Sequence, residues 1–136
     1  MQLKNEVGVV VLRVILGVIF FIHGFVKFQG GIENIAGWFG SIGIPGLMAY
    51  VVASIEVIGG IALIIGLGTR IVSALFVFLM IGAIIKVKLA AGFLGNGEMA
   101  GYELELSYLA MALFLAINGS KQFSLGQLLV KKTENI

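Results

Sequence analysis

The sequence predicts an all-α integral membrane protein, built as a bundle of four transmembrane helices. Three observations predict this fold class. Hydrophobic residues make up 60% of the 136 residues and charged residues only 12%, whereas about a quarter of the residues in a typical soluble domain are charged. The mean hydropathy is +1.11. Four separate apolar runs approach or exceed the roughly 20 helical residues that are needed to cross a bilayer.

Each predicted transmembrane helix corresponds to one of these apolar runs. The runs cover about residues 7–28, 47–67, 70–90 and 102–118. We expect the first run to be a membrane helix rather than a cleavable signal peptide, because it is too long, carries internal charges and precedes no A-x-A site. The fourth run is the shortest and the most polar at its start. We expect the four helices to form a single domain over residues 1–136.

The connections between the runs differ in length and predict different structures. The short sequence GLGT at residues 66–69 predicts a tight turn, so we expect the second and third helices to pack antiparallel. The longer first connection contains IENIAGWF, which predicts a short helix in the membrane interface with Trp38 at headgroup level. The third connection is rich in glycine and apolar enough to dip back toward the membrane.

The positively charged residues predict the orientation of the chain. On the side of the two termini and the second connection, the basic residues are Lys4, Arg70, Lys121, Lys131 and Lys132. On the opposite side, Lys27, Lys86 and Lys88 all lie at helix ends rather than in connections. The positive-inside rule therefore favours a cytoplasmic location for both termini.

The composition also argues against several kinds of site. The chain has no cysteine, which removes disulfides, thiolate nucleophiles and cysteine-ligated metal clusters. With a single histidine, we expect no histidine-based metal site within one chain. The net charge is only +2 and the basic residues are scattered, so we expect no nucleic-acid partner.

Ionisable side chains lie inside the apolar runs, where each costs about 2.5–3.5 kcal/mol at a helix centre. On a helical wheel, Arg13, His23 and Lys27 fall within an arc of roughly 80°. Gly17 and Gly24 lie near that arc and would let another helix approach closely. The first run therefore has one polar face, which we expect to point into the bundle.

We expect Arg13 to form an ion pair with Glu56 in the second run. With a rise of about 1.5 Å per residue, the two residues lie about one helical turn apart in height. An ion pair is a common way for two opposite charges to be tolerated inside a membrane. Such a pair could be purely structural and set the register of the two helices, so this alternative stays open.

Two helices carry like charges two residues apart near the opposite surface. Lys86 and Lys88 differ by about 200° around their helix, and so do Glu103 and Glu105. We expect Lys86 and Glu103 to face the bundle. A simpler explanation stays open for Lys27, Lys88 and Glu105, because charged side chains near the ends of a span can reach the headgroups. The tyrosines near the same boundary fit an aromatic belt equally well.

Three blocks of the sequence resemble the DoxX family of small four-helix bacterial membrane proteins. The segment LRVILGVIFFIHGFVKF resembles its first-helix signature, through Arg13, Gly17, His23, Gly24, Lys27 and Phe28. The segment IEVIGGIALIIGLGTR resembles its second-helix block, through Glu56, Gly60, Gly66 and Arg70. The segment NGEMAGYELELSYLAMALFLAINGSKQFSL resembles its closing block, through Gly101, Tyr102, Glu103, Gly119, Phe123, Ser124 and Leu125. Together the blocks cover nearly the whole chain.

The resemblance implies a multi-pass protein of the bacterial cell membrane with a redox-associated role. The family is associated with quinone-linked sulfur oxidation, oxidative-stress assemblies and detoxification of catechol-like compounds. A quinone- or catechol-like molecule needs an apolar pocket with a few polar groups. The candidate catalytic residues, which would exchange protons or donate to a quinone oxygen, are His23, Lys27 and Glu103. The candidate ligand-binding residues are Arg13, Glu56, Lys86 and Tyr102.

Two departures from the family pattern argue against a borrowed metal or haem site. Gly126 stands where the closing block often has an acidic residue, and Lys86 stands where many relatives have histidine. The chain encodes no recognisable redox centre, so electrons would come from a bound cofactor, such as a quinone, or from a partner.

Two other classes of function stay open. The protein could be an anchor or subunit without chemistry of its own, which would recruit a soluble oxidoreductase. It could also be a small carrier for protons or an organic solute, because charges at several depths can mark a polar path. A homo-oligomer is compatible with each of these functions.

Overall fold

The computed structural model describes residues 3–121 and 128. In chain order these residues form α1 (Leu3–Gln29), α2 (Ile32–Ser41), α3 (Leu47–Ile65), α4 (Thr69–Ala83), a π-helical turn η1 (Ile84–Lys88), a 3-10 turn η2 (Leu89–Ala91) and α5 (Glu103–Asn118). Within this part of the chain, the sole β-type pairing is one isolated antiparallel bridge between Gly95 and Ala100. The predicted all-α fold class is confirmed.

Three of the described helical segments are long and apolar enough to cross a membrane. They are Lys4–Gln29, Leu47–Ile65 and Thr69–Ala91, and the last of these joins α4 to η1 and η2. Helix α5 has 16 residues, which gives it a length of about 24 Å, shorter than a hydrocarbon core of about 30 Å. The fourth crossing and the cytoplasmic location of the termini therefore stay predictions.

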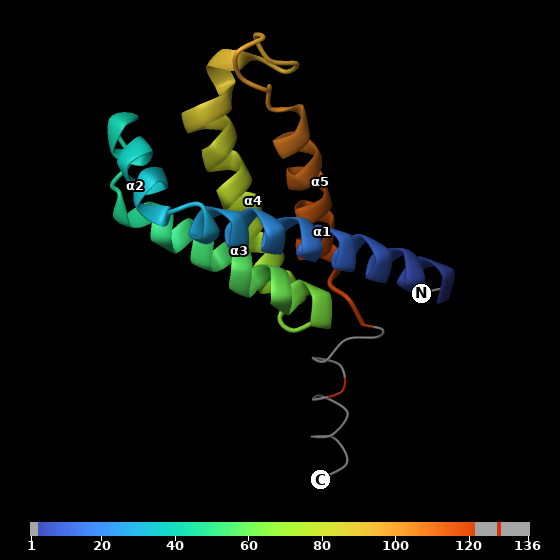
Figure 1. Ribbon diagram of the computed structural model, residues 1–136. Helices are drawn as coiled ribbons and strands as arrows, with labels where there is room; N and C mark the ends of the chain where they lie inside the picture. The colour runs from blue at the N-terminus through green and yellow to red at the C-terminus, as the bar shows by residue number, and fades with distance from the viewer. Residues whose placement is uncertain (1–2, 122–127, 129–136) are drawn as a thin grey trace.

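The long helices are arranged as two antiparallel pairs. Helices α1 and α3 run side by side in opposite directions, and α4 and α5 form the second pair (Figure 1). The pairs converge near the turn between α3 and α4 and splay apart toward α2 and toward the connection that precedes α5 (Figure 1). The end of the molecule that contains α2 and this connection is called the distal end below.

The turn between α3 and α4 is as tight as the sequence predicts. Gly66 and Gly68 both have a positive φ, +77° and +60°, which favours glycine because a side chain would be strained there. The Leu67 N–H donates to the Ala62 carbonyl at 2.8 Å, and the Gly66 N–H donates to the Leu63 carbonyl at 3.2 Å. This is the Schellman pattern that ends many helices, and it lets α4 start immediately.

The short helix predicted in the first connection is confirmed as α2. It packs on α3, because Ile32 of α2 forms a small buried cluster with Ala49 and Ala53 of α3. Trp38 lies on its exposed side. That exposure suits a tryptophan in the membrane interface.

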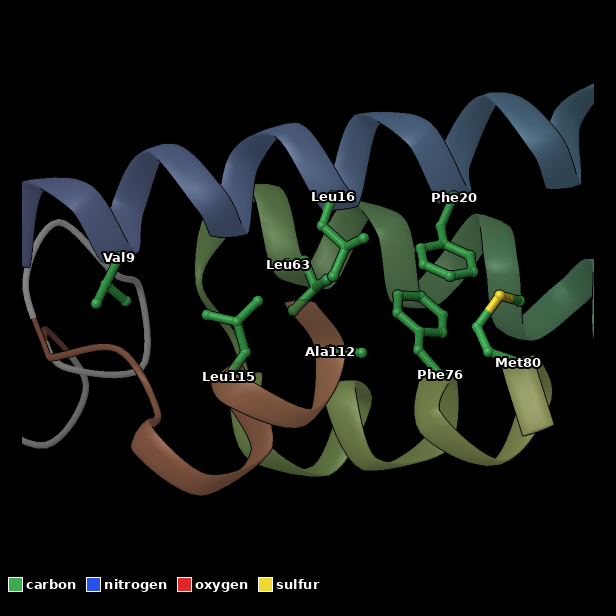
Figure 2. Packing of buried hydrophobic residues seen from close by; sticks show 8 residues of the cluster. All are labelled: Val9, Leu16, Phe20, Leu63, Phe76, Met80, Ala112 and Leu115. Carbon is green, nitrogen blue, oxygen red and sulfur yellow. The ribbon is translucent and has the colours of Figure 1, made fainter. Parts of the chain in front are cut away.

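The main apolar core lies between the two helix pairs (Figure 2). Phe20 of α1 and Phe76 of α4 stack with ring centroids 3.9 Å apart and an interplanar angle of 15°. Leu16, Leu63 and Leu115 are completely buried beside them. The outward faces of the helices remain apolar, since many large hydrophobic side chains are exposed, and such faces suit contact with lipid.

Glycines set the distance and the register between α1 and α3. A Cβ atom on Gly60 would lie 2.7 Å from the Gly17 carbonyl oxygen and 2.6 Å from the Phe21 nitrogen. A Cβ atom on Gly24 would lie 2.8 Å from the Ala53 carbonyl oxygen. These small residues let the two backbones approach closely, as in many membrane helix pairs. Of the polar face predicted for the first run, Gly17, Gly24 and Lys27 thus meet α3.

Candidate functional site

The buried ion pair of the α1–α3 interface joins Lys27 to Glu56. Lys27 Nζ lies 2.7 Å from Glu56 Oε1 and 2.9 Å from Oε2. The Glu56 side chain is 5% exposed and the Lys27 side chain 26%. Both carboxylate oxygens thus accept a hydrogen bond from one ammonium group, which compensates for their removal from water.

The predicted ion pair between Arg13 and Glu56 is wrong. The prediction set the start of the first run, at residue 7, level with the end of the antiparallel second run, but α1 already starts at Leu3. The glycine contacts place Gly24 directly against Glu56. Arg13 lies about 16 Å farther along the α1 axis, beyond the reach of the Glu56 side chain.

Arg13 instead contacts residues at the end of the bundle that lies opposite Glu56. It is 2% exposed, its Nη1 donates to Ser120 Oγ at 2.9 Å, and its Nη2 lies 3.5 Å from the Ile64 carbonyl oxygen. Nearby, Arg70 Nη2 donates to the Asn118 carbonyl at 3.4 Å. Two arginines therefore hold the end of α5 against α1, α3 and α4, and this arrangement gives Arg13 a structural role.

His23 lies one helical turn before Lys27 on α1, at the distal end of the core. Its side chain is exposed in the single chain, and its ring lies edge-on to Tyr108 of α5 with centroids 6.3 Å apart. Tyr108 also contacts Phe20, at a centroid distance of 5.9 Å. His23 and Tyr108 therefore face each other across the gap between the two helix pairs, above the Phe20–Phe76 stack.

The second charged pair joins Lys88 to Glu105, not Lys86 to Glu103. Lys88 Nζ lies 3.6 Å from Glu105 Oε1, and the two side chains are 21% and 17% exposed. Lys86 and Glu103 are exposed, so the expectation that they face the bundle is wrong. The helix widens into the π-helical turn η1 at this point, which changes the direction of each side chain relative to a regular α-helix.

Tyr102 supports the connection between η2 and α5. Its ring lies edge-on to Phe93 with centroids 5.7 Å apart, and its N–H donates to the Gly92 carbonyl at 3.1 Å. Lys88 Nζ also donates to the Ala100 carbonyl at 3.2 Å. Tyr102 and Lys88 thus hold the two ends of this connection next to each other.

Three contacting pairs lie on the parts of the two helix pairs that extend toward the distal end: His23 with Tyr108, Lys27 with Glu56, and Lys88 with Glu105. We call these six residues the distal cluster. Three of them were not predicted from the sequence as site residues. Lys88, Glu105 and Tyr108 were explained by their position at the membrane boundary. The spacing of Glu105 and Tyr108, three residues apart on one helix, could have indicated a shared face. The Oε2 atom of Glu105 is buried and has no hydrogen-bond partner, so it can accept a further donor.

Two segments of the sequence, the end of the closing block and the basic tail, lie largely outside the described residues. They contain Phe123, Ser124, Leu125, Gly126, Lys131 and Lys132, which lie outside the described residues. Among the residues that are described, no three His, Asp or Glu side chains lie together as a metal site would require.

The comparisons with known proteins agree with this architecture. The DoxX family profile matches residues 8–89, which include most of α1, all of α3 and α4, and the Lys27–Glu56 pair. The chain belongs to the DoxX family. The resemblance inferred from the three sequence blocks is thus confirmed.

Two relatives cover nearly the whole chain. The protein named "putative oxidoreductase CatD" of Bacillus subtilis is 48% identical over 135 residues, covering 99% of this chain and 96% of the relative. The protein named "uncharacterized membrane protein Rv3486" of Mycobacterium tuberculosis is 31% identical over 135 residues, covering 92% of this chain and 83% of the relative. No solved structure matches the chain significantly.

Proposed function

We propose that this DoxX protein binds a quinone- or catechol-like molecule at the distal cluster, as part of a membrane oxidoreductase system. The observation that carries the proposal is the position of the buried Lys27–Glu56 pair, one helical turn from His23, which faces Tyr108. The name of the Bacillus subtilis relative, which contains the word oxidoreductase, supports the redox part.

The chemistry of the cluster suits a flat ring that carries two oxygen atoms. Tyr108 is half-buried and packs on Phe20, so its ring offers an aromatic surface for the ring of the ligand. Lys27 and Lys88 can donate hydrogen bonds to carbonyl oxygens, and Glu105 Oε2 can accept one from a hydroxyl group. The imidazole ring of His23 has one nitrogen that can accept a hydrogen bond and one that can donate it. Lys88 and Glu105 take the roles first assigned to Lys86 and Glu103.

The residues of the chain would bind the ring and move protons, while the electrons come from elsewhere. The chain has no cysteine and one histidine, and we infer that a bound redox cofactor or a partner enzyme supplies the electrons. We further propose that the protein lies in the bacterial cell membrane with both termini in the cytoplasm, because the basic residues near its two ends favour that side.

The structure favours this function over transport of a solute across the membrane. The polar contacts of Arg13 and the distal cluster lie at opposite ends of the molecule. Between them, the core residues Leu16, Phe20, Leu63, Phe76 and Leu115 are closely packed and at most 2% exposed. The described residues therefore offer no continuous polar path. A subunit that merely recruits a partner would lack ligand affinity, and the following experiment distinguishes it.

The test is binding of decylubiquinone and of 4-methylcatechol to the full chain in mild detergent, measured by isothermal titration calorimetry. Loss of a hydrogen bond to a charged group costs about 1.5–3 kcal/mol, so we expect His23→Ala to weaken binding roughly 10- to 100-fold. The control is Lys86→Ala, an exposed residue outside the cluster. Unchanged affinity in His23→Ala would remove His23 from the site, and no binding by the unmodified protein would favour the anchor function.

A further inference from the structure

A groove lies between the first turns of α1 and the last turn of α5, at the end of the molecule opposite the distal cluster. It has a volume of about 560 Å³, and its lining residues are Lys4, Asn5, Gly8, Val9, Leu12, Phe114 and Asn118. Proteins bind small molecules and cofactors in pockets of about 300–1,000 Å³. The groove is thus large enough for part of a lipid, and no residue of the distal cluster lines it.

The lining is polar at one end and apolar at the other. Lys4 and Asn5 lie in the first turn of α1 and Asn118 ends α5, so the polar groups of the lining all come from helix ends. Leu12 lies about 12 Å farther along α1, and Phe114 lies one turn before Asn118. Because α1 is long and apolar enough to cross the membrane, its first turn lies near headgroup level and the apolar part near the acyl chains.

The lining of the groove carries one charge, the ammonium group of Lys4, and no carboxylate. Glu6, two residues along α1, is buried and does not line the groove. The ion pairs among the described residues are Lys27–Glu56 and Lys88–Glu105, so Lys4 has no carboxylate partner in that part of the chain. Asn118 uses one amide hydrogen in a bond to the Gly119 carbonyl, at 3.0 Å, and its second hydrogen can donate to a ligand. An ammonium group and amide donors are suitable partners for a phosphate diester.

We propose that this groove binds one anionic phospholipid from the membrane leaflet at the amino end. The phosphate would lie against Lys4, Asn5 and Asn118, and the start of one acyl chain would lie along Val9, Leu12 and Phe114. The proposal does not depend on the redox function, because the two sites lie at opposite ends of the molecule and share no residue.

Gly8 provides a direct test of the groove. No heavy atom lies within 4 Å of the position that a Cβ atom on Gly8 would occupy. Because Gly8 lines the groove, we expect Gly8→Leu to place its side chain in the groove. Gly82 of α4 is also free of neighbours within 4 Å and does not line the groove. Gly82→Leu is therefore the matched control, since it adds the same side chain to a helical glycine elsewhere.

The experiment is native mass spectrometry of the full chain, titrated in detergent with phosphatidylglycerol or phosphatidylcholine of equal chain length. We expect the unmodified protein and Gly82→Leu to retain one phosphatidylglycerol, and Gly8→Leu to lose this binding at least tenfold. A lysine near a membrane surface contributes about 1 kcal/mol to the binding of anionic lipid, so Lys4→Gln should reduce the preference for phosphatidylglycerol about fivefold. Lys4 is exposed, which keeps this second variant independent of folding.

Three results would overturn the proposal. Gly8→Leu could retain phosphatidylglycerol as the unmodified protein does, which would place the lipid elsewhere. Equal retention of the two lipids, unaffected by Lys4→Gln, would show that the headgroup is not recognised. An unmodified protein that is dimeric, with a monomeric Gly8→Leu variant and no change in bound lipid, would show that a second copy of the chain occupies the groove.

Discussion

Lys27 and Glu56 form a buried ion pair across the α1–α3 interface, with Lys27 Nζ within 2.9 Å of both carboxylate oxygens. The pair lies next to Gly24, whose missing side chain lets Glu56 reach α1. Gly24 thus lets α1 and α3 approach closely, and this short distance between the helices allows Lys27 to reach Glu56. Lys27 therefore compensates the negative charge of Glu56 inside the apolar part of the molecule.

The first prediction concerns this ion pair. Removing one partner leaves the other charge buried and uncompensated, so Lys27→Met or Glu56→Gln alone should lower the free energy of unfolding by about 3–5 kcal/mol. The double variant Lys27→Met with Glu56→Leu should recover most of that loss, because no buried charge remains. Reversible unfolding in mild detergent measures both the loss in the single variants and the recovery in the double variant. Lys86→Met, at an exposed lysine, is the control, and equal effects of Lys27→Met and Lys86→Met would contradict the importance of the pair.

The second prediction concerns the glycine contact between α1 and α3. The added methyl group of Gly60→Ala would meet backbone atoms of Gly17 and Phe21 at 2.6–2.7 Å. Backbone cannot move aside cheaply, so we expect a loss of about 1–3 kcal/mol in the free energy of unfolding. Gly82→Ala adds the same group in open space and should be neutral or slightly stabilising, because alanine favours a helix. Similar stabilities for the two variants would show that α1 and α3 are packed less tightly.

The third prediction compares two phenylalanines on one helix. Phe76 is completely buried against Phe20, whereas Phe78 is 72% exposed. Phe76→Ala should cost about 3–5 kcal/mol, because it leaves a cavity where the two helix pairs meet. In a bilayer the exposed face contacts lipid, and Phe78→Ala should cost less than about 1 kcal/mol. Thermal unfolding of the two variants in nanodiscs checks the order, and a larger effect at Phe78 would contradict the packing of the two pairs.

The fourth prediction concerns the closure of the connection between η2 and α5. Lys88 binds both Glu105 and the Ala100 carbonyl, so Lys88→Met should loosen residues 92–102. Partly exposed ion pairs contribute about 0.2–1 kcal/mol, which corresponds to hydrogen exchange up to roughly fivefold faster. The amides of Tyr102 and Glu103, which donate to the Gly92 and Phe93 carbonyls, are the ones to follow by mass spectrometry. Lys86→Met should leave their exchange unchanged, and an equal effect of Lys86→Met would reject this role of Lys88.

Local features of the chain were sufficient to predict its helices. The apolar runs predict α1, α3 and α4 with their connections, because helix length and hydropathy depend only on neighbouring residues. GLGT predicts the tight turn through the conformations that glycine allows, and IENIAGWF predicts α2. The face formed by Arg13, His23 and Lys27 also follows from helical periodicity alone.

The partners of the charged residues were decided by the tertiary structure. Glu56 pairs with Lys27 and not with Arg13, because the axial register depends on where Gly17 and Gly24 meet α3, and no single run of sequence contains that information. Lys88 rather than Lys86 faces Glu105, because the helix widens at residues 84–88. Periodicity determines which residues share a face of one helix. Only the packing of the four long helices determines which faces meet, at what height, and therefore which charges lie within reach of each other.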